Sequence, residues 1–389
     1  MRIVVLKEDG PSPGRERRVA IVPESVKRFA QKKIDVAIES GAGEGAFFSD
    51  AEYAAHGAAV EADRAKAIAA ADAVMRIRIP TVAEVGSLRE GTALFAPLLP
   101  LVSRDLVAAL AARRVTAFAV DFIPRTTVAQ MMDVLSSQAA AAGYEAVVVA
   151  AGMLPRFVPM LITAAGTIAP ATLLVLGAGV AGLSAIGTAK RLGARVEAFD
   201  VRKVAKEQVE SLGAKFVEVD SDEDAQAAGG YAKEVSEEYR RKQAQVLAHH
   251  VARADAIVCT ALVPGKRAPL LVTGDMLKTM KPGSVIVDLA AEQGGNCEGS
   301  EAGKTVVRHG VTIVGAVDLP SRLAVHASQM WSRNMEKLLF HLTRDGNLRL
   351  DRGDEITRGC LITHAGEVVQ EQVREAMGLG ALASKEVAA

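Results

Sequence analysis

The stretch TLLVLGAGVAG, residues 172–182, decides the fold. Its apolar run Leu173–Leu176 predicts a strand that helices cover on both faces. Gly177, Gly179 and Gly182 follow at once in the spacing GxGxxG, and a helical pattern begins after them. The glycine spacing alone is weak evidence, but a strand, a glycine-rich turn and a helix in this order predict a dinucleotide-binding βαβ unit.

Each glycine has its own physical role in such a unit. Gly177 permits the tight turn, Gly179 lets a pyrophosphate approach the backbone, and Gly182 lets the helix and the strand pack closely. The start of the helix offers free N–H groups and a partial positive charge to phosphates. The alternative interpretation is a glycine-rich turn that binds no ligand.

An acidic residue follows at the distance that this type of site requires. Asp200 closes the next predicted strand, 23 residues after Gly177. A carboxylate at this point accepts a hydrogen bond from a free ribose 2′-hydroxyl and repels a 2′-phosphate, so the sequence predicts NAD(H) in preference to NADP(H). Arg202 and Lys203 follow, and they either weaken that preference or form a solvated surface pair.

Short β-branched runs alternate with Ala-rich amphipathic stretches along the chain, which predicts an α/β protein with parallel sheets. The strand candidates of the N-terminal half are Ile3–Leu6, Val36–Glu39, Val74–Ile77, Ala93–Phe95 and Thr116–Ala119. Those that follow are Thr172–Leu176, Arg195–Phe199, Lys215–Val219, Ala256–Thr260, Ser284–Asp288 and Thr312–Val314. Six strands over about 150 residues match the size of one complete dinucleotide-binding domain.

The region after about residue 320 is too small to fold alone. It contains a helical pattern, Arg322–Leu342, and weak strand signals around Leu348 and Cys360. We therefore expect it to pack against the N-terminal domain, with the dinucleotide domain as an insertion. The predicted fold is two Rossmann-like doubly wound parallel-sheet domains. Their residues are 1–125 with 320–389 and 126–319, and helices over 126–145 and 320–343 join them.

Composition excludes several classes of protein. Lys plus Arg and Asp plus Glu both total 46, so the chain is not a broadly basic nucleic-acid binder. The three cysteines are odd in number and widely spaced, which indicates a reducing compartment and neither a zinc site nor a disulfide framework. Prolines and glycines interrupt the uncharged stretch 157–189, so we do not expect a membrane span there. The chain is expected to be soluble and cytoplasmic.

The histidines offer little acid/base chemistry. A dehydrogenase acting on 2-oxo or 2-amino acids needs a positioned proton donor and acceptor, usually His. Of the seven histidines, only His326 has an expected position near the dinucleotide site, in the helix after residue 320. Hydride transfer between two nicotinamides moves no proton to or from either ring, so it needs only positioning and protection from water. This pattern favours transfer from one nucleotide to another.

Residues 220–245 have the composition of a mobile flap. The acidic run Asp220–Asp224 precedes Gly229, Gly230 and Tyr231, and paired glycines beside an aromatic ring suit a hinge that closes over a ligand. The alternative is a surface loop that the tyrosine anchors.

Several longer stretches resemble a known family. They are Arg17–Pro23, Pro124–Gln130, Met132–Gln138, Gly177–Gly182, Ala189–Gly193, Lys206–Gly213, Gly229–Glu234, Thr260–Lys266 and Met280–Ser284. Over nearly its full length the chain resembles domain I, the NAD(H)-binding alpha subunit of proton-translocating NAD(P) transhydrogenase, whose plan the alanine dehydrogenases share. The stretches Arg125–Ser136 and Gly229–Lys233 separate the first group from the second.

The resemblance implies a role for each matching residue. Arg125, Asp133 and Ser136 would orient the dihydronicotinamide, Gln130 would reach toward NADP(H) on a partner, and Tyr231 would close over the nucleotide. From the chemistry alone, an Arg–carboxylate pair such as Arg125 and Asp133 is most often a structural salt bridge, so its role here rests mainly on the resemblance. The residues implied to contact NAD(H) are Arg125, Thr126, Thr127, Val128, Gln130, Met131, Met132, Asp133, Gly177, Ala178, Gly179, Val180, Gly182, Asp200, Val201, Arg202, Gly230, Gln243 and Leu262. The alternative interpretation of Leu262 is an ordinary core residue that contacts no nucleotide.

The resemblance further implies direct hydride transfer between NADH and NADP⁺ on a partner subunit, coupled to proton translocation. The implied partners are the membrane subunits, namely a separate membrane-embedded alpha subunit and an NADP-binding beta subunit, and a second copy of this chain. With no span expected before Ala389, this chain would lie peripherally on the cytoplasmic face of the inner membrane. The alternatives are an NAD-dependent alanine dehydrogenase and a non-catalytic NAD-sensing protein.

Three positions depart from the patterns of these relatives. Leu99 stands where alanine dehydrogenases carry a substrate histidine, and Arg78 stands where they carry a lysine, although Arg18 is shared. Both departures argue against an amino-acid substrate. Asp318 stands where the transhydrogenase pattern has Asn. This change puts in doubt whether the side chain at this position binds the nicotinamide carboxamide as it would in that family.

Overall fold

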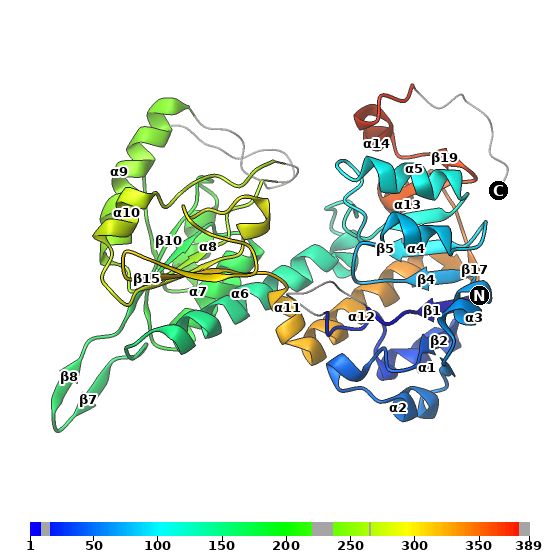
Figure 1. Cartoon of the computed structure of the whole chain (residues 1–389), viewed down its shortest axis with the longest axis horizontal. Coiled ribbons are helices and arrows are strands. Elements are labelled where there is room, and N and C mark those ends of the chain that lie inside the picture. The colour runs from blue at the N-terminus through cyan, green and yellow to red at the C-terminus, as the bar shows by residue number, and fades with distance from the viewer. Residues whose placement is uncertain (9–15, 220–235, 264–265, 381–389) are drawn as a thin grey trace. The chain divides into compact units, whose positions relative to one another are not determined.

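The computed structural model describes residues 1–8, 16–219, 236–263 and 266–380 (Figure 1). The chain forms two compact units, of which the second is inserted in the first. Unit 1 comprises Met1–Gln138 and Leu323–Ala389, and unit 2 comprises Ala139–Arg322. The first boundary lies at Gln138 and not at residue 125, because the segment after Arg125 packs on helix α12 (Ala324–Leu342) of unit 1.

Unit 1 is built on an eight-stranded sheet in the order β19-β18-β6-β5-β4-β1-β2-β3 (Figure 1). The first six strands in the chain pair in parallel, and only β18 and β19 pair antiparallel. The strands are β1 (Arg2–Val5), β2 (Asp35–Glu39), β3 (Ala59–Glu61), β4 (Ala73–Met75), β5 (Ala93–Ala96), β6 (Thr116–Ala119), β18 (Leu361–His364) and β19 (Glu367–Val368).

Helices cover both faces of this sheet. Ile3 and Val5 lie in one hydrophobic cluster and Val4 and Leu6 in another, as expected for a strand with two buried faces. The helices are α1 (Pro23–Gln31), α2 (Asp50–Ala55), α3 (Arg64–Ala69), α4 (Val82–Gly86), α5 (Arg104–Ala112), α12 (Ala324–Leu342), α13 (Glu355–Cys360) and α14 (Glu371–Ala376), with 3₁₀ turns Glu44–Ala46 and η2 (Ala129–Met132) and a short hairpin, β16 (Thr343–Arg344) and β17 (Asn347–Leu348).

Unit 2 carries a seven-stranded sheet in the order β11-β10-β9-β12-β13-β15-β14, and only β14 pairs antiparallel. Leu173 and Val175 pack into one cluster and Leu174 and Leu176 into another, so both faces of β9 are covered as predicted. The strands are β9 (Thr172–Leu176), β10 (Arg195–Phe199), β11 (Lys215–Phe216), β12 (Ala256–Cys259), β13 (Val285–Asp288), β14 (Thr305–Arg308) and β15 (Val311–Gly315). The helices are α6 (Val134–Met153), which begins in unit 1, α7 (Val180–Arg191), α8 (Ala205–Ser211), α9 (Glu237–Arg253), α10 (Gly274–Thr279) and α11 (Leu319–Arg322), with a 3₁₀ turn Ala291–Gln293.

The two mainly parallel sheets confirm the predicted fold class. The predicted strands 116–119, 172–176 and 195–199 match residue for residue. The predicted helix over 126–145 was wrong in its start, because Asp133 is extended and its carboxylate accepts the Ser136 N–H at 2.9 Å. Helix α6 therefore begins at Val134.

Helix α6 is the one described helix that is long and apolar enough, by length and composition alone, to cross a membrane. Ala146, Val147 and Ala150 lie fully buried in the core of unit 2. A core helix passes the same test of length and composition, and 44% of the apolar window of α6 is buried within the structure.

The sequence analysis also missed a hairpin in unit 2. Strands β7 (Leu161–Thr163) and β8 (Gly166–Ile168) pair only with each other and project away from the sheet of unit 2 (Figure 1). Ile162 and Ile168 are exposed on it, Ile162 to 75%. Residues 162–169 are all exposed, so no described part of unit 2 covers this arm. An isolated two-stranded hairpin is only marginally stable in water.

Candidate functional site

The glycine-rich turn has the geometry that its sequence predicts. Gly177 has a φ of +98°, in the left-handed region that favours glycine, and its N–H bonds the Phe199 carbonyl at 2.8 Å. A Cβ on Gly182 would stand 1.9 Å from the Gly177 carbonyl oxygen, so only glycine fits at this point of α7. The turn thus brings the start of α7 directly to the end of β9.

The start of α7 suits an anion. Gly179 is the N-cap residue and supplies no side-chain cap to the first N–H groups of the helix. A Cβ on Gly179 would meet no atom within 4 Å, so the backbone faces open space there. Open space beside free N–H groups at a helix start fits a pyrophosphate, which would lie against Ala178, Gly179 and Val180.

Asp200 lies just after β10, next to this turn. One oxygen, Oδ2, accepts the Ala178 N–H at 2.7 Å and the Arg202 Nη2 at 2.7 Å. The other, Oδ1, accepts the Arg202 N–H at 2.9 Å and its Nε at 2.8 Å. This pairing raises the pKa of the Arg202 guanidinium and ties the acidic residue to the glycine-rich turn. Arg202 is therefore neither free nor a simple surface residue.

The end of β12 completes this region of unit 2. The Thr260 hydroxyl donates to the Gly177 carbonyl at 2.9 Å, which joins the two neighbouring strand ends. Leu262 is 38% exposed and so is not an ordinary core residue. Gln243 lies buried on α9, while Gly230 and Tyr231 lie outside the described residues. Of the predicted flap, residues 237–245 are the first turns of α9.

The predicted nicotinamide loop belongs to unit 1 and follows β6. Arg125, Thr127, Val128, Gln130 and Met131 are exposed, whereas Met132 is buried. Helix α12 anchors this loop, because the Nδ2 of Asn334 on α12 donates to the Met131 carbonyl at 2.8 Å. The Thr126 hydroxyl donates to Glu355 at 2.9 Å.

The structure brings two members of the predicted trio together. The Ser136 hydroxyl donates to Asp133 Oδ2 at 2.6 Å and the Ser136 N–H donates to Oδ1 at 2.9 Å. The Asp133 carboxylate is thereby fixed at the start of α6, where the helix dipole favours a negative charge. Arg125 is exposed on the same loop, eight residues before Asp133.

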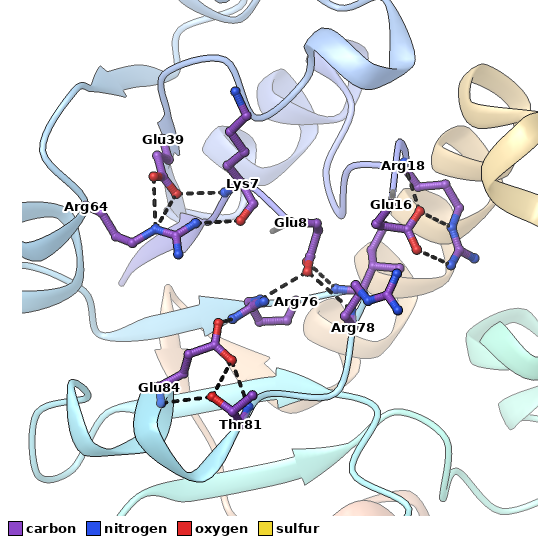
Figure 2. A network of polar contacts seen from close by, with 11 residues as sticks. Lys7, Glu8, Glu16, Arg18, Glu39, Arg64, Arg76, Arg78, Thr81 and Glu84 are labelled. Atoms are coloured by element: carbon purple, nitrogen blue, oxygen red, sulfur yellow. Dashed lines mark hydrogen bonds and ion pairs between the residues drawn. The ribbon is translucent and has the colours of Figure 1, made fainter. Parts of the chain in front are cut away.

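Arg18 lies in a buried network of unit 1 (Figure 2). Its Nε and Nη2 donate to the two oxygens of Glu16 at 2.8 and 2.7 Å, and its Nη1 donates to Gln138 at 2.7 Å. Gln138 in turn donates to the Ala327 carbonyl of α12 at 3.1 Å. Three of the five N–H groups of the guanidinium therefore donate to Glu16 and Gln138.

A second buried acid stands beside it (Figure 2). Glu8 accepts the Ile77 N–H at 2.6 Å and the Arg76 Nε at 3.2 Å, and Arg76 also donates to Glu84 at 2.6 Å. Burial raises the pKa of Glu8. Glu8 also accepts the Arg78 N–H at 3.4 Å, so this network holds the backbone at the position where alanine dehydrogenases carry a lysine.

Leu99 takes an unusual conformation. Its φ is +44°, its side chain is 49% exposed, and its N–H donates to Asp121 at 2.8 Å. An apolar side chain therefore stands at the expected position of a substrate histidine. Asp318 also has a positive φ, +49°, which Asp tolerates better than most residues.

The described residues contain no group of His, Cys, Asp and Glu that fits a metal ion. Cys259, Cys297 and Cys360 are free and buried. Sequence reasoning missed Asn296 and Asn334, which hold loops through buried amides. The pair Gly294-Gly295 before Asn296 was the available signal, since both glycines have a positive φ.

Comparison with known proteins assigns the class. The alanine dehydrogenase/PNT N-terminal domain matches residues 4–142, and the alanine dehydrogenase/PNT C-terminal domain matches residues 146–371. The chain belongs to the alanine dehydrogenase/PNT family, which implies binding of NAD(H).

Within that family the matches favour one branch. The chain is 47% identical over 378 residues to an NAD(P) transhydrogenase subunit alpha protein of Rhodospirillum rubrum, covering 95% of this chain and 98% of that protein. The crystal structure of a transhydrogenase from Sinorhizobium meliloti matches with a TM-score of 0.82 and 42% identity, over 95% of this chain and 99% of that one. The alanine dehydrogenase of Halomonas elongata is 32% identical, over 97% of each chain. These matches place the chain among the NAD(P) transhydrogenase alpha subunits, as the sequence predicted. An alpha subunit is part of a larger assembly, which implies partner subunits.

Proposed function

We propose that this chain is the NAD(H)-binding component of a proton-translocating NAD(P) transhydrogenase. When bound, NADH supplies a hydride to NADP⁺ on the partner subunit, which gives NAD⁺ and NADPH without loss of a proton from either ring. The proposal rests on the glycine-rich turn of unit 2 and on the similarity to transhydrogenase alpha subunits.

The residues of this chain bind and orient. The N–H groups at the start of α7 hold the pyrophosphate, and Asp200 holds the adenosine ribose. The Asp133 carboxylate, fixed by Ser136, and the exposed Arg125 orient the nicotinamide, while Gln130 faces the partner's nucleotide. These steps require positioning and no acid or base, because hydride transfer between nicotinamides moves no proton.

The observation that carries the choice against alanine dehydrogenase is the pairing of Arg18. A substrate carboxylate is best bound by a free bidentate edge of a guanidinium. Glu16 occupies the edge formed by Nε and Nη2, Gln138 accepts from Nη1, and Leu99 supplies no acid or base. An amino or oxo acid would have only the remaining N–H groups of Nη1 and Nη2, and the Glu16 carboxylate already neutralises the guanidinium that would attract it.

The projecting hairpin supports the proposed homodimer. Ile162, Ile168, Met160 and Phe157 are exposed along the arm and its base. No charged residue occurs between Arg156 and Lys190. The arm therefore lacks the charges that keep exposed strands from pairing with other chains. We assign its covering surface to a second copy of this chain.

The proposed partners are a separate membrane-embedded alpha subunit and an NADP-binding beta subunit, with this chain peripheral on the cytoplasmic face of the inner membrane. The test mixes the purified chain with the NADP-binding domain of a transhydrogenase, NADPH and a spectrally distinct NAD analogue. Absorbance should report rapid reduction of the analogue only when both proteins are present. An absence of exchange despite measured NADH binding, together with NADH oxidation by pyruvate and ammonia, would replace the proposal with alanine dehydrogenase.

A further inference from the structure

Asn296 is a fully buried polar residue in the loop after β13. Its Oδ1 accepts the Ala261 N–H at 3.0 Å, and its Nδ2 donates to the Ala261 carbonyl at 2.8 Å and to the Pro269 carbonyl at 2.8 Å. Both hydrogens of the amide are therefore used, and the side chain pairs with Ala261 as a neighbouring strand would.

The backbone of Asn296 is itself held firmly. Its N–H donates to Asp288 Oδ2 at 2.9 Å, and its carbonyl accepts the N–H groups of Leu271 and Val272 at 2.8 and 2.9 Å. Asp288 ends β13, is fully buried, and also accepts the Ala290 and Cys297 N–H groups at 2.9 and 3.1 Å. The backbone of Asn296 is thus tied to the end of strand β13 and to the segment that contains Leu271 and Val272.

The segment that Asn296 holds belongs to the candidate nucleotide site. Ala261 lies between Thr260, whose hydroxyl bonds the Gly177 carbonyl at 2.9 Å, and the partly exposed Leu262. A continuous path of hydrogen bonds and backbone therefore runs from β13 through Asn296 to the glycine-rich turn. Loss of the amide would free the Ala261 segment on one side and leave two carbonyls and one N–H without these partners.

We propose that Asn296 is a positioning residue of the NAD(H) site. It fixes Ala261 and Leu262 relative to Gly177, and so determines how tightly the adenosine and pyrophosphate moieties of the cofactor are held. All its hydrogen-bond partners lie in unit 2, beside the glycine-rich turn that we assign to the pyrophosphate, so it acts on binding and not on hydride transfer. The inference rests on the proposed function and names a further determinant of the same site.

The test compares Asn296→Ala with Val285→Ala in the complete chain. Val285 is buried at the opposite end of the same strand, so its truncation weakens the core of unit 2 without touching the loop. Hydride exchange with the NADP-binding domain gives KM for the NAD analogue and kcat, and fluorescence titration gives Kd for NADH and a competition Kd for ADP. Thermal unfolding gives the stability of each variant.

In Asn296→Ala, KM and both Kd values should rise about tenfold, because the three buried hydrogen bonds that hold the Ala261 segment in place are lost. The kcat should stay within about twofold of wild type, since the reacting groups are unchanged. Val285→Ala should lower the unfolding temperature with KM unchanged. If Asn296→Ala does not fold, Asn296→Ser, which keeps one donor, should show a rise of about threefold.

The inference is overturned if KM and the ADP affinity stay within about twofold of wild type in the folded Asn296 variant. It is also overturned if Val285→Ala raises KM as much as Asn296→Ala does, because the amide would then act only through general stability. Failure of the proposed function has a different signature, since the wild-type chain would then show no exchange.

Discussion

The Asp200 carboxylate holds the Arg202 guanidinium through two side-chain hydrogen bonds of 2.8 and 2.7 Å, and it also accepts two backbone N–H groups. A carboxylate offers about four acceptor positions, so all are filled. In the proposed site, a ribose hydroxyl would bind Asp200 only in place of one of these donors, and the side chain of Arg202 is the flexible one. Arg202 would then lie close to the ribose as a cation that favours a 2′-phosphate, so the proposed preference for NAD(H) would depend on the negative charge of Asp200.

Asp200→Asn should weaken NADH binding at least about tenfold and narrow the preference for NADH over NADPH by about 100-fold. The amide binds ribose less well and frees Arg202 to meet a 2′-phosphate. Fluorescence titrations with both nucleotides measure this. The control is Asp255→Asn, which also breaks an ion pair with an arginine, Arg156, but lies just before β12, at the opposite end of the strands from Asp200. An unchanged preference in Asp200→Asn would remove this residue from the ribose site.

Ser136→Ala should lower the rate of hydride exchange about tenfold and leave NADH affinity within about threefold. The variant loses the 2.6 Å bond that orients Asp133. Stopped-flow absorbance with the NADP-binding domain measures the rate. Ser137→Ala is the matched control, because its hydroxyl donates to the Val134 carbonyl of the same helix and not to Asp133. Equal losses in both variants would mean that the effect comes from the helix and not from Asp133.

Gly182→Ala should abolish NADH binding or prevent unit 2 from folding, since its Cβ would overlap the Gly177 carbonyl oxygen. Gly187→Ala is the control in the same helix α7. Its Cβ meets only the flexible end of Arg191 at 3.4 Å, and it should gain about 0.5–1 kcal/mol in stability from the higher helix propensity of alanine. Circular dichroism and NADH titration of both variants distinguish them. Normal binding by Gly182→Ala would contradict the described turn.

Ile162→Asp should convert a dimer into a monomer by placing a charge on the exposed hairpin of unit 2. Light scattering after gel filtration gives the mass. Val307→Asp introduces the same charge at another exposed apolar position, on the edge strand β14, and should leave the mass unchanged. A wild-type chain that is already monomeric, or a dimer that survives the change, would assign the hairpin to another partner.

The three thiols should be unreactive in the folded chain. Burial raises the pKa of Cys297 to about 12 and that of Cys360 to about 12, and raises that of Cys259 as well. Between about pH 9 and 12 the thiols ionise in the unfolded chain and not in the folded one, so their contribution to stability is lost as pH rises. Thiol titration at about pH 8, near the pKa of a free thiol, should detect no thiol before unfolding and all three after it. One fast-reacting thiol in the folded chain would contradict the described burial.

The sequence predicted those features of the fold that local physics controls. The run Leu173–Leu176 is buried on both faces, and Gly177 and Gly182 are glycines for reasons that a strand-turn-helix pattern already implies. Arg202 was less accessible to prediction. Its pairing with Asp200 depends on side-chain geometry, which spacing along a chain does not specify.

Other features were hidden because they depend on distant partners. Asn296 holds Ala261, and Asn334 holds Met131, across long separations in sequence. The hairpin residues 161–168 follow Pro159 in an uncharged stretch, where apolar composition suits a loop or a strand equally well. The start of α6 was misplaced because the 3₁₀ turn Ala129–Met132 continues its helical pattern up to Asp133.

The pairing of β18 with β6 sets the order in which the two units are completed during synthesis. Phe118 meets Leu361 in the sheet of unit 1, and α12, which covers that sheet, also comes after unit 2 in the chain. Unit 2 therefore emerges whole from the ribosome while unit 1 still lacks two strands of its sheet, the β16–β17 hairpin and the helices α12, α13 and α14. Long-range strand pairing is slow, and apolar surface stays exposed until it is complete. Incomplete unit 1, and not unit 2, is therefore the part of the nascent chain that most needs a chaperone.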